Sequence, residues 1–153
     1  RYVQLFLSGQ PWDTHDKNAE RLKGLCAKTD QPSAALVRDL KARGLLDSTV
    51  VLWTGEFGRL PISQGKDGRD HNRHAFSLWA AGGGFKKGYV HGATDEFGYK
   101  SVQDVVSVHD FHATLLHTMG VNHRALHFPH EGREASLTDS EVTGANIVPA
   151  LLA

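Results

Sequence analysis

Two apolar runs, each followed at once by a polar cluster, constrain the fold of this chain most. Residues 2–7 (YVQLFL) lead into Trp12-Asp13-Thr14-His15, and residues 50–53 (VVLW) lead into Thr54-Gly55-Glu56-Phe57-Gly58-Arg59. An apolar run bounded by turn residues is typical of a β-strand. Because ligands bind outside the carboxyl ends of the strands in an open α/β sheet, two neighbouring parallel strands would bring both clusters to one place.

The rest of the chain predicts an α/β fold with a mostly parallel sheet flanked by helices. We expect strands over residues 2–7, 49–54 and 76–81, helices over residues 16–44 and 107–119, a hairpin over residues 85–99 and a short helix near residues 146–152. The first helix is predicted to break near Pro32, and the second to begin at a capping box at Ser107. The strand–helix–strand order predicts a right-handed crossover.

Length and charge bound the classes of partner. The chain has 153 residues, with 17 basic and 17 acidic side chains and therefore no formal net charge. No global field attracts nucleic acid or an anionic membrane, so we expect neither as a partner. We expect a single α/β domain over residues 1–153 that buries roughly 70% of the surface of its unfolded chain. The oligomeric state is left open.

Carboxylates and imidazoles at the predicted strand ends indicate a metal site. Asp13 and His15 lie two residues apart after the first strand, and Glu56 lies between two glycines after the second. His71 belongs to the polar run Gly68-Arg69-Asp70-His71-Asn72-Arg73-His74. These residue types are the ligands that zinc takes in proteins. We therefore predict a divalent metal held by Asp13, His15, Glu56 and His71, with zinc expected ahead of manganese, magnesium or calcium.

Four further side chains are candidates for catalysis. The guanidinium groups of Arg59 and Arg69 suit a phosphate or sulfate oxyanion. Asp70 is either a ligand or the carboxylate that orients an imidazole, and Asp70 or His74 could carry a proton. Alternatives stay open: an ion pair between Glu56 and Arg59 that orders the loop, or a solvated loop face. A Walker phosphate loop and a Gly-x-Ser-x-Gly elbow are absent from the sequence.

The motifs together resemble domain-of-unknown-function family 1501, over about residues 2–139. The resemblance is carried by Trp12 to His15, Asp39-Leu40-Lys41 to Gly44-Leu45-Leu46-Asp47, Thr54 to Arg59, Gly68 to His71, Ala81-Gly82-Gly83-Gly84 and Gly92-Ala93-Thr94-Asp95-Glu96. That family is grouped with the alkaline phosphatase and sulfatase superfamily, whose members hydrolyse phosphate or sulfate esters with one or two divalent metals. The resemblance implies an alkaline phosphatase-like fold, incomplete here and equivalent to the C-terminal part of a longer hydrolase, and in bacteria it implies export to the periplasm or beyond.

By the same resemblance, Asp13 and His15 are similar to the first ligand pair, Glu56 to the next carboxylate and His71 to a later histidine ligand. Two departures are visible. Phe57 stands where many superfamily members have a metal-binding histidine, and the superfamily's nucleophile and early aspartates are not found in this sequence.

The expected function is metal-assisted hydrolysis of a small-molecule phosphate or sulfate ester, by this chain or as part of a longer enzyme. Metal-activated water would attack, and an arginine would stabilise the developing charge. Two alternatives stay open: a metal- or anion-binding fragment without turnover, and a structural or interaction domain whose histidines lie on the surface.

Overall fold

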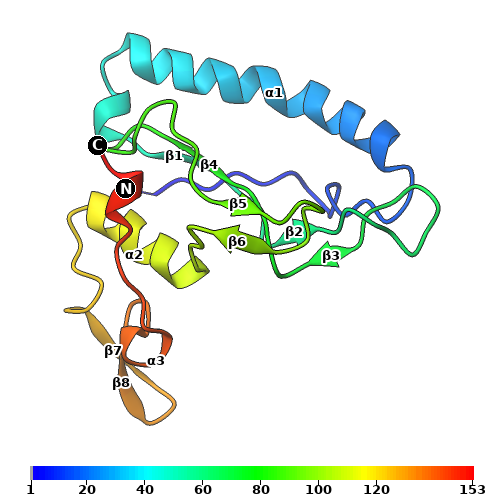
Figure 1. The fold of residues 1–153 in the computed structure, drawn as a ribbon. Coiled ribbons are helices and arrows are strands. Elements are labelled where there is room, and N and C mark those ends of the chain that lie inside the picture. The colour runs from blue at the N-terminus through cyan, green and yellow to red at the C-terminus, as the bar shows by residue number, and fades with distance from the viewer. Residues whose placement is uncertain (1) are drawn as a thin grey trace.

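The structure is a computed structural model, and it describes residues 2–153 (Figure 1). Its elements, in chain order, are α1 (Asn18–Ala42), the short helix η1 (Leu46–Ser48), β1 (Val51–Trp53), β2 (Gly58–Arg59), β3 (His71–Asn72), β4 (Trp79–Ala81), β5 (Ala93–Thr94), β6 (Ser101–Gln103), α2 (Val108–Thr118), β7 (His127–His130), β8 (Arg133–Ser136), α3 (Ser140–Thr143) and η2 (Pro149–Leu151).

The predicted mostly parallel sheet is wrong. Within residues 2–153 the strands form two-stranded antiparallel sheets: β1 with β4, β2 with β3, β5 with β6 and β7 with β8. A parallel pair needs a long crossover, usually a helix, between its strands. Residues 54–78 instead run out through β2 and return through β3, so β4 comes back against β1 in the opposite direction. The fold is a small mixed one, not a sheet with helices on both faces.

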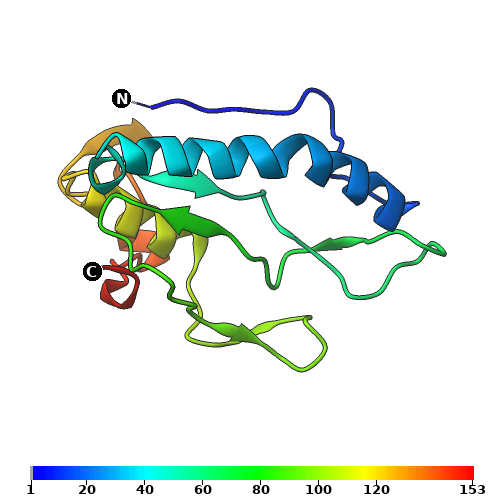
Figure 2. The ribbon, with the colours of Figure 1, turned by 90° about the horizontal axis from the view of Figure 1, so that it is seen from above.

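The predicted first strand is wrong too, because residues 2–7 are extended but pair with no other backbone in the part of the chain that the structure describes. Figure 2 shows this segment running alongside α1. Tyr2, Val3, Leu5 and Phe6 are each more than three-quarters exposed. An apolar run becomes a strand only when a neighbour supplies its hydrogen bonds.

Helix α1 is continuous, although a break was predicted at Pro32. Its inward side chains recur every three or four residues from Leu22 through Ser33 to Leu40, and Pro32 faces solvent. The packed face thus stays in register across the proline, and packing outweighs its local cost. The helix ends at Ala42, and the predicted cap residue Gly44 follows two residues later with φ +69°.

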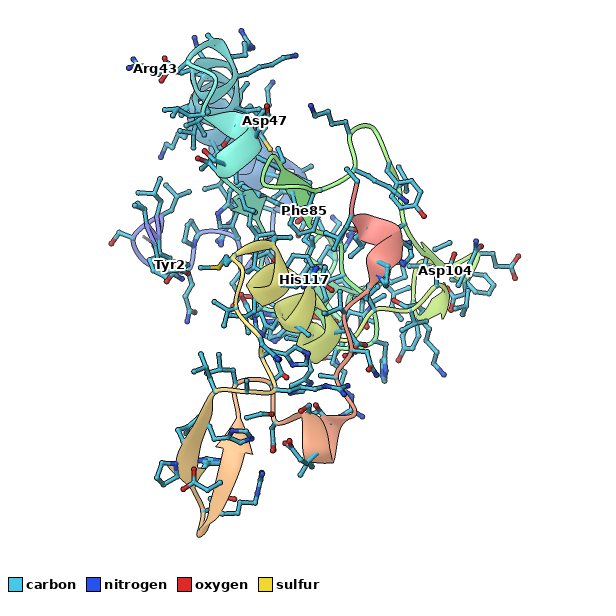
Figure 3. The ribbon with its side chains drawn as sticks, turned by 90° about the vertical axis from the view of Figure 1, so that its left-hand side faces the viewer. Tyr2, Arg43, Asp47, Phe85, Asp104 and His117 are labelled. Carbon is cyan, nitrogen blue, oxygen red and sulfur yellow. The ribbon has the colours of Figure 1, made fainter. Side chains whose placement is uncertain are left out.

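Helix α2 begins with the predicted capping box. The Ser107 hydroxyl accepts the Asp110 amide, and the Asp110 carboxylate accepts the Ser107 amide. The hairpin β7·β8 and α3, which the sequence did not predict, lie apart from α1 in Figure 1 and at the lower edge of Figure 3. The pairing of Arg133 with both carboxylate oxygens of Asp139 ties this hairpin to the start of α3.

The folded chain leaves much of its surface open. Its accessible area is 11,116 Å², whereas a folded monomer of its mass exposes about 7,600 Å². It therefore buries about 54% of its unfolded surface instead of the expected 70%. Trp53 and Trp79, paired across β1 and β4, are among the exposed apolar side chains. No helix within residues 2–153 is long and apolar enough to cross a membrane.

Candidate metal centre

Two chain segments that are distant in sequence lie side by side and build the site. The Arg69 amide donates to the Thr14 carbonyl at 2.9 Å, and the Asn18 amide donates to the Asp67 carbonyl at 3.0 Å. The Lys17 amide donates to the Asp67 carboxylate. These bonds dock residues 14–18, just before and into α1, against residues 67–69.

Gly68 permits this close approach. A Cβ at that position would lie 1.8 Å from the His15 carbonyl oxygen and 2.1 Å from the carbonyl carbon, so no other residue fits here. Thr14 beside it is 1% exposed and donates its hydroxyl proton to Asn18. The segment that carries Asp13 and His15 is thereby held by backbone contacts and not by the predicted sheet.

The antiparallel ladder of β2 and β3 supplies the rest of the site. Arg59 pairs with His71 in the ladder, and the Leu60 amide donates to the Asp70 carbonyl beyond it. Side chains directly opposite each other in such a pair lie on the same face. The guanidinium of Arg59 and the imidazole of His71 therefore both reach Asp13.

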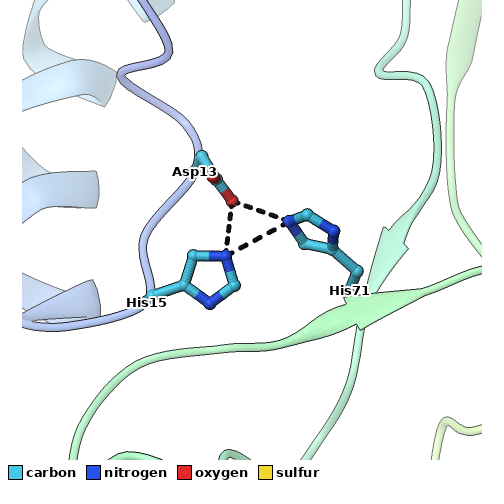
Figure 4. Close-up of side chains that lie close together, drawn as sticks. All are labelled: Asp13, His15 and His71. Carbon is cyan, nitrogen blue, oxygen red and sulfur yellow. Dashed lines mark hydrogen bonds and ion pairs between the residues drawn. The ribbon is translucent and has the colours of Figure 1, made fainter.

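Three ligand atoms meet at this point (Figure 4). Asp13 Oδ1 lies 3.0 Å from His15 Nε2 and 2.9 Å from His71 Nε2, and the two nitrogens are 3.2 Å apart. Ligand atoms at 2.0–2.1 Å from a tetrahedral zinc ion lie about 3.3 Å apart. The triangle is thus within a few tenths of an ångström of the size that such an ion requires, and its donor set of one carboxylate and two imidazoles suits zinc.

Two charged neighbours complete the cluster. Arg59 Nη1 donates to Asp13 Oδ1 at 2.6 Å, and its guanidinium carbon lies 5.7 Å from the Phe57 ring centroid. Asp70 Oδ2 accepts the Gln64 amide at 2.7 Å, and its Oδ1 lies 3.4 Å from His15 Nδ1, the ring nitrogen that faces away from the triangle. A carboxylate in that position fixes the ring orientation of a ligand histidine.

The electrostatics of the cluster favour an ionised Asp13. The hydrogen bond from Arg59 and, next, that from His71 lower the pKa of the Asp13 carboxyl from 3.8 to about 2. Asp13 is therefore ionised at neutral pH, which a metal ligand must be. The side chains of His15 and His71 are about half exposed, so solvent reaches the triangle.

The other candidates lie outside the triangle. Glu56 is exposed in the turn before β2, and the cluster found within residues 2–153 does not include it. Arg69 donates to the Gly68 carbonyl at 2.6 Å. His74 stacks on Tyr99, with 5.5 Å between ring centroids. The structure thus brings together Asp13, His15, His71, Arg59 and Asp70 but not Glu56, Arg69 or His74.

Sequence reasoning missed two supports of the site. Trp12 packs edge-on against Trp53 at 6.0 Å and joins the first polar cluster to the end of β1. Asn72 is 1% exposed; its amide donates to the Tyr99 carbonyl and accepts the His74 amide. The alternation of a strand, with His71 outward and Asn72 inward, was the signal that could have identified the second.

Comparison with known proteins found one family. The model of the family described as "Protein of unknown function (DUF1501)" matches residues 1–151. Neither the curated proteins nor the solved structures gave a match.

Proposed function

The chain belongs to the DUF1501 family of proteins of unknown function, and we propose that Asp13, His15 and His71 bind a divalent metal, zinc first, to hydrolyse phosphate or sulfate esters. The observation that carries the proposal is the triangle of one carboxylate oxygen and two imidazole nitrogens with edges of 2.9–3.2 Å. Three protein ligands and an open fourth position are typical of catalytic zinc sites, whereas structural sites are closed by four.

The residues around the triangle suit attack by water on an anionic ester. A divalent ion bound there supplies Lewis acidity and lowers the pKa of a water molecule to about 7. Asp13, His15 and His71 would hold the ion, and Asp70, 3.4 Å from His15 Nδ1, would orient that imidazole. Because Arg59 lies 2.6 Å from Asp13 Oδ1, its remaining N–H groups are available to an ester's non-bridging oxygens beside the ion.

The resemblance to the alkaline phosphatase and sulfatase superfamily supports ester substrates of this kind. For this chain acting by itself, the reaction we propose is a direct displacement by water. Water forms the new bond to phosphorus or sulfur, the bond to the leaving oxygen breaks, and the leaving oxygen takes a proton. The same ligands would serve if the chain acts as part of a longer enzyme.

The test begins with metal binding. Chelator-stripped protein is titrated with zinc by calorimetry, in parallel with the variants His71→Ala and His127→Ala. His127 lies on the exposed strand β7 and is the matched control. Loss of an orienting residue costs about 10- to 100-fold in metal affinity, so loss of a ligand should cost more than about 100-fold. Equal zinc affinity of the wild type and His71→Ala would refute the site.

Turnover separates an enzyme from a binding fragment. Zinc-loaded protein is assayed with a phosphate monoester, a phosphate diester and a sulfate ester, and again after His71→Ala. Zinc-dependent turnover that the variant abolishes supports hydrolysis. Stoichiometric zinc without turnover supports the non-catalytic alternative, and absence of stoichiometric zinc supports the structural alternative.

A further inference from the structure

A cavity of about 280 Å³ opens directly beside the metal triangle. His71, one of the three proposed ligands, forms part of its lining. The remaining lining residues come from the segment around β2, from β3 and the residues after it, and from the turn before β6, namely Phe57, Leu60, Asn72, Arg73, His74 and Tyr99. His71 is thus common to the triangle and to the lining of this cavity.

Aromatic rings form the walls. The Phe57 ring centroid lies 4.5 Å from that of His71, so one wall is continuous with a metal ligand. Tyr99 and His74, which also line the cavity, are stacked with 5.5 Å between ring centroids and an angle of 27° between their planes. Aromatic pairs of this kind favour a further planar ring in offset or edge contact.

The buried polar group of the cavity is already used. Asn72 is 1% exposed; its Nδ2 donates to the Tyr99 carbonyl and its Oδ1 accepts the His74 amide, each at 2.9 Å. A sugar ring would bring several hydroxyls that need partners, and leaving them unpaired is costly. An aromatic ring needs none. A cavity of roughly 150 Å³ already accommodates benzene, so this volume admits a substituted ring.

From these contacts we infer that the cavity, here called the aryl pocket, binds the aromatic leaving group of an ester whose phosphate or sulfate lies at Asp13, His15 and His71. The inference rests on the proposed function and narrows its substrates to aryl esters. In the reaction, the oxygen of water bonds to phosphorus or sulfur, and the bond from that atom to the aryl oxygen breaks. The phenolate leaves into the pocket and takes up the proton that the attacking water has lost.

Two non-hydrolysable anions test the pocket without turnover. Phenylphosphonate and methylphosphonate carry the same anion and differ in the ring. Their affinities for zinc-loaded protein are measured by calorimetry. We expect phenylphosphonate to bind at least about tenfold more tightly, because its ring leaves water for an apolar cavity. Equal affinities would overturn the aryl pocket while leaving the metal centre intact.

Variants of the cavity lining show whether the preference for phenylphosphonate over methylphosphonate arises in the aryl pocket. Tyr99→Ala removes a wall but keeps the carbonyl that Asn72 binds, so it should reduce the preference to less than about threefold with zinc affinity unchanged. Leu60→Trp should also reduce the preference for phenylphosphonate, because the larger side chain fills the cavity. This second variant keeps the test decisive if Tyr99→Ala does not fold. Tyr89→Ala, outside the lining, is the control and keeps the preference.

Each outcome decides the inference. A tenfold preference retained in both pocket variants would overturn it, because the ring would then bind elsewhere. Failure of the wild type to bind zinc would defeat the proposed function and this inference together. Zinc binding with no preference defeats the inference alone.

Discussion

Replacement of Gly68 by alanine should disrupt the candidate metal centre more than it disrupts the rest of the fold. The added Cβ would lie 1.8 Å from the His15 carbonyl oxygen, and real Cβ contacts are essentially never shorter than 3.0 Å. Both nearest atoms are backbone atoms, so no side chain can rotate away. The segment carrying Asp13 and His15 must therefore retreat from residues 67–69 by about 1.2 Å.

That displacement is large relative to the tolerance of the site. The edges of the triangle measure 2.9–3.2 Å, and metal–ligand distances vary by about 0.2 Å in genuine sites. A retreat of His15 by about 1.2 Å opens the triangle well beyond that range. We expect zinc affinity to fall by more than about 100-fold and stability to fall by about 1–3 kcal/mol, the usual cost of overpacking.

Calorimetric titration with zinc measures the first effect, and urea denaturation followed by circular dichroism measures the second. Gly65→Ala is a graded control, because its Cβ would lie 3.3 Å from the same His15 oxygen, a distance that a shift of a few tenths of an ångström relieves. It should keep zinc affinity within about threefold of the wild type. A folded Gly68→Ala variant with wild-type zinc affinity would refute the argument that this backbone contact positions the ligands.

Three other perturbations test separate parts of the molecule. Arg59→Gln should raise the pKa of Asp13 from about 2 towards 3.8, as NMR titration of the carboxyl would detect. Because the lowered pKa is what makes ionised Asp13 stabilising, the variant should be less stable than the wild type at neutral pH, and this difference should shrink as pH falls through the folded pKa of the wild type. Ser107→Ala removes the hydroxyl that accepts the Asp110 amide and should cost about 1 kcal/mol in urea denaturation, and an unchanged midpoint would contradict the cap. Phe6→Lys should reduce self-association measured by analytical ultracentrifugation. The accessible surface of the chain exceeds that of an average monomer of its mass by about 3,500 Å², and a dimer interface needs only about 800 Å² per chain. A wild type that stays monomeric at high concentration would refute this prediction.

Local signals predicted the ends of the helices well. The Ser107 capping box and Gly44 at the end of α1 depend on hydrogen bonds and a positive φ within a few residues, so they could be predicted from the sequence. The side chains that α2 buries could not be predicted in this way. The apolar side chains Val108 and Met119 of this segment are about half exposed, whereas Ala113 and Thr114 are fully buried. Which face packs depends on neighbours distant in sequence.

The sheet was the part that sequence patterns failed to predict. Apolar runs at residues 2–7 and 50–53 identified extended segments, but neither their partners nor their directions follow from composition. Residues 2–7 found no partner within the described chain, and β1 found β4 running antiparallel. Periodicity tells that a segment can be a strand, whereas pairing is decided by the path of the chain between strands.

Three of the four candidate ligands, Asp13, His15 and His71, nevertheless came together, because their assembly does not depend on the predicted sheet. We predicted that these residues would meet at the carboxyl ends of parallel strands, and that reason was wrong. The structure instead brings them together through the β2·β3 ladder and the backbone contact at Gly68. The register of that ladder also explains which candidates meet. It sets Arg59 opposite His71 and begins at Gly58, so Glu56 precedes it in an exposed turn. Residue types can therefore nominate the members of a candidate site, whereas strand register decides which of them meet.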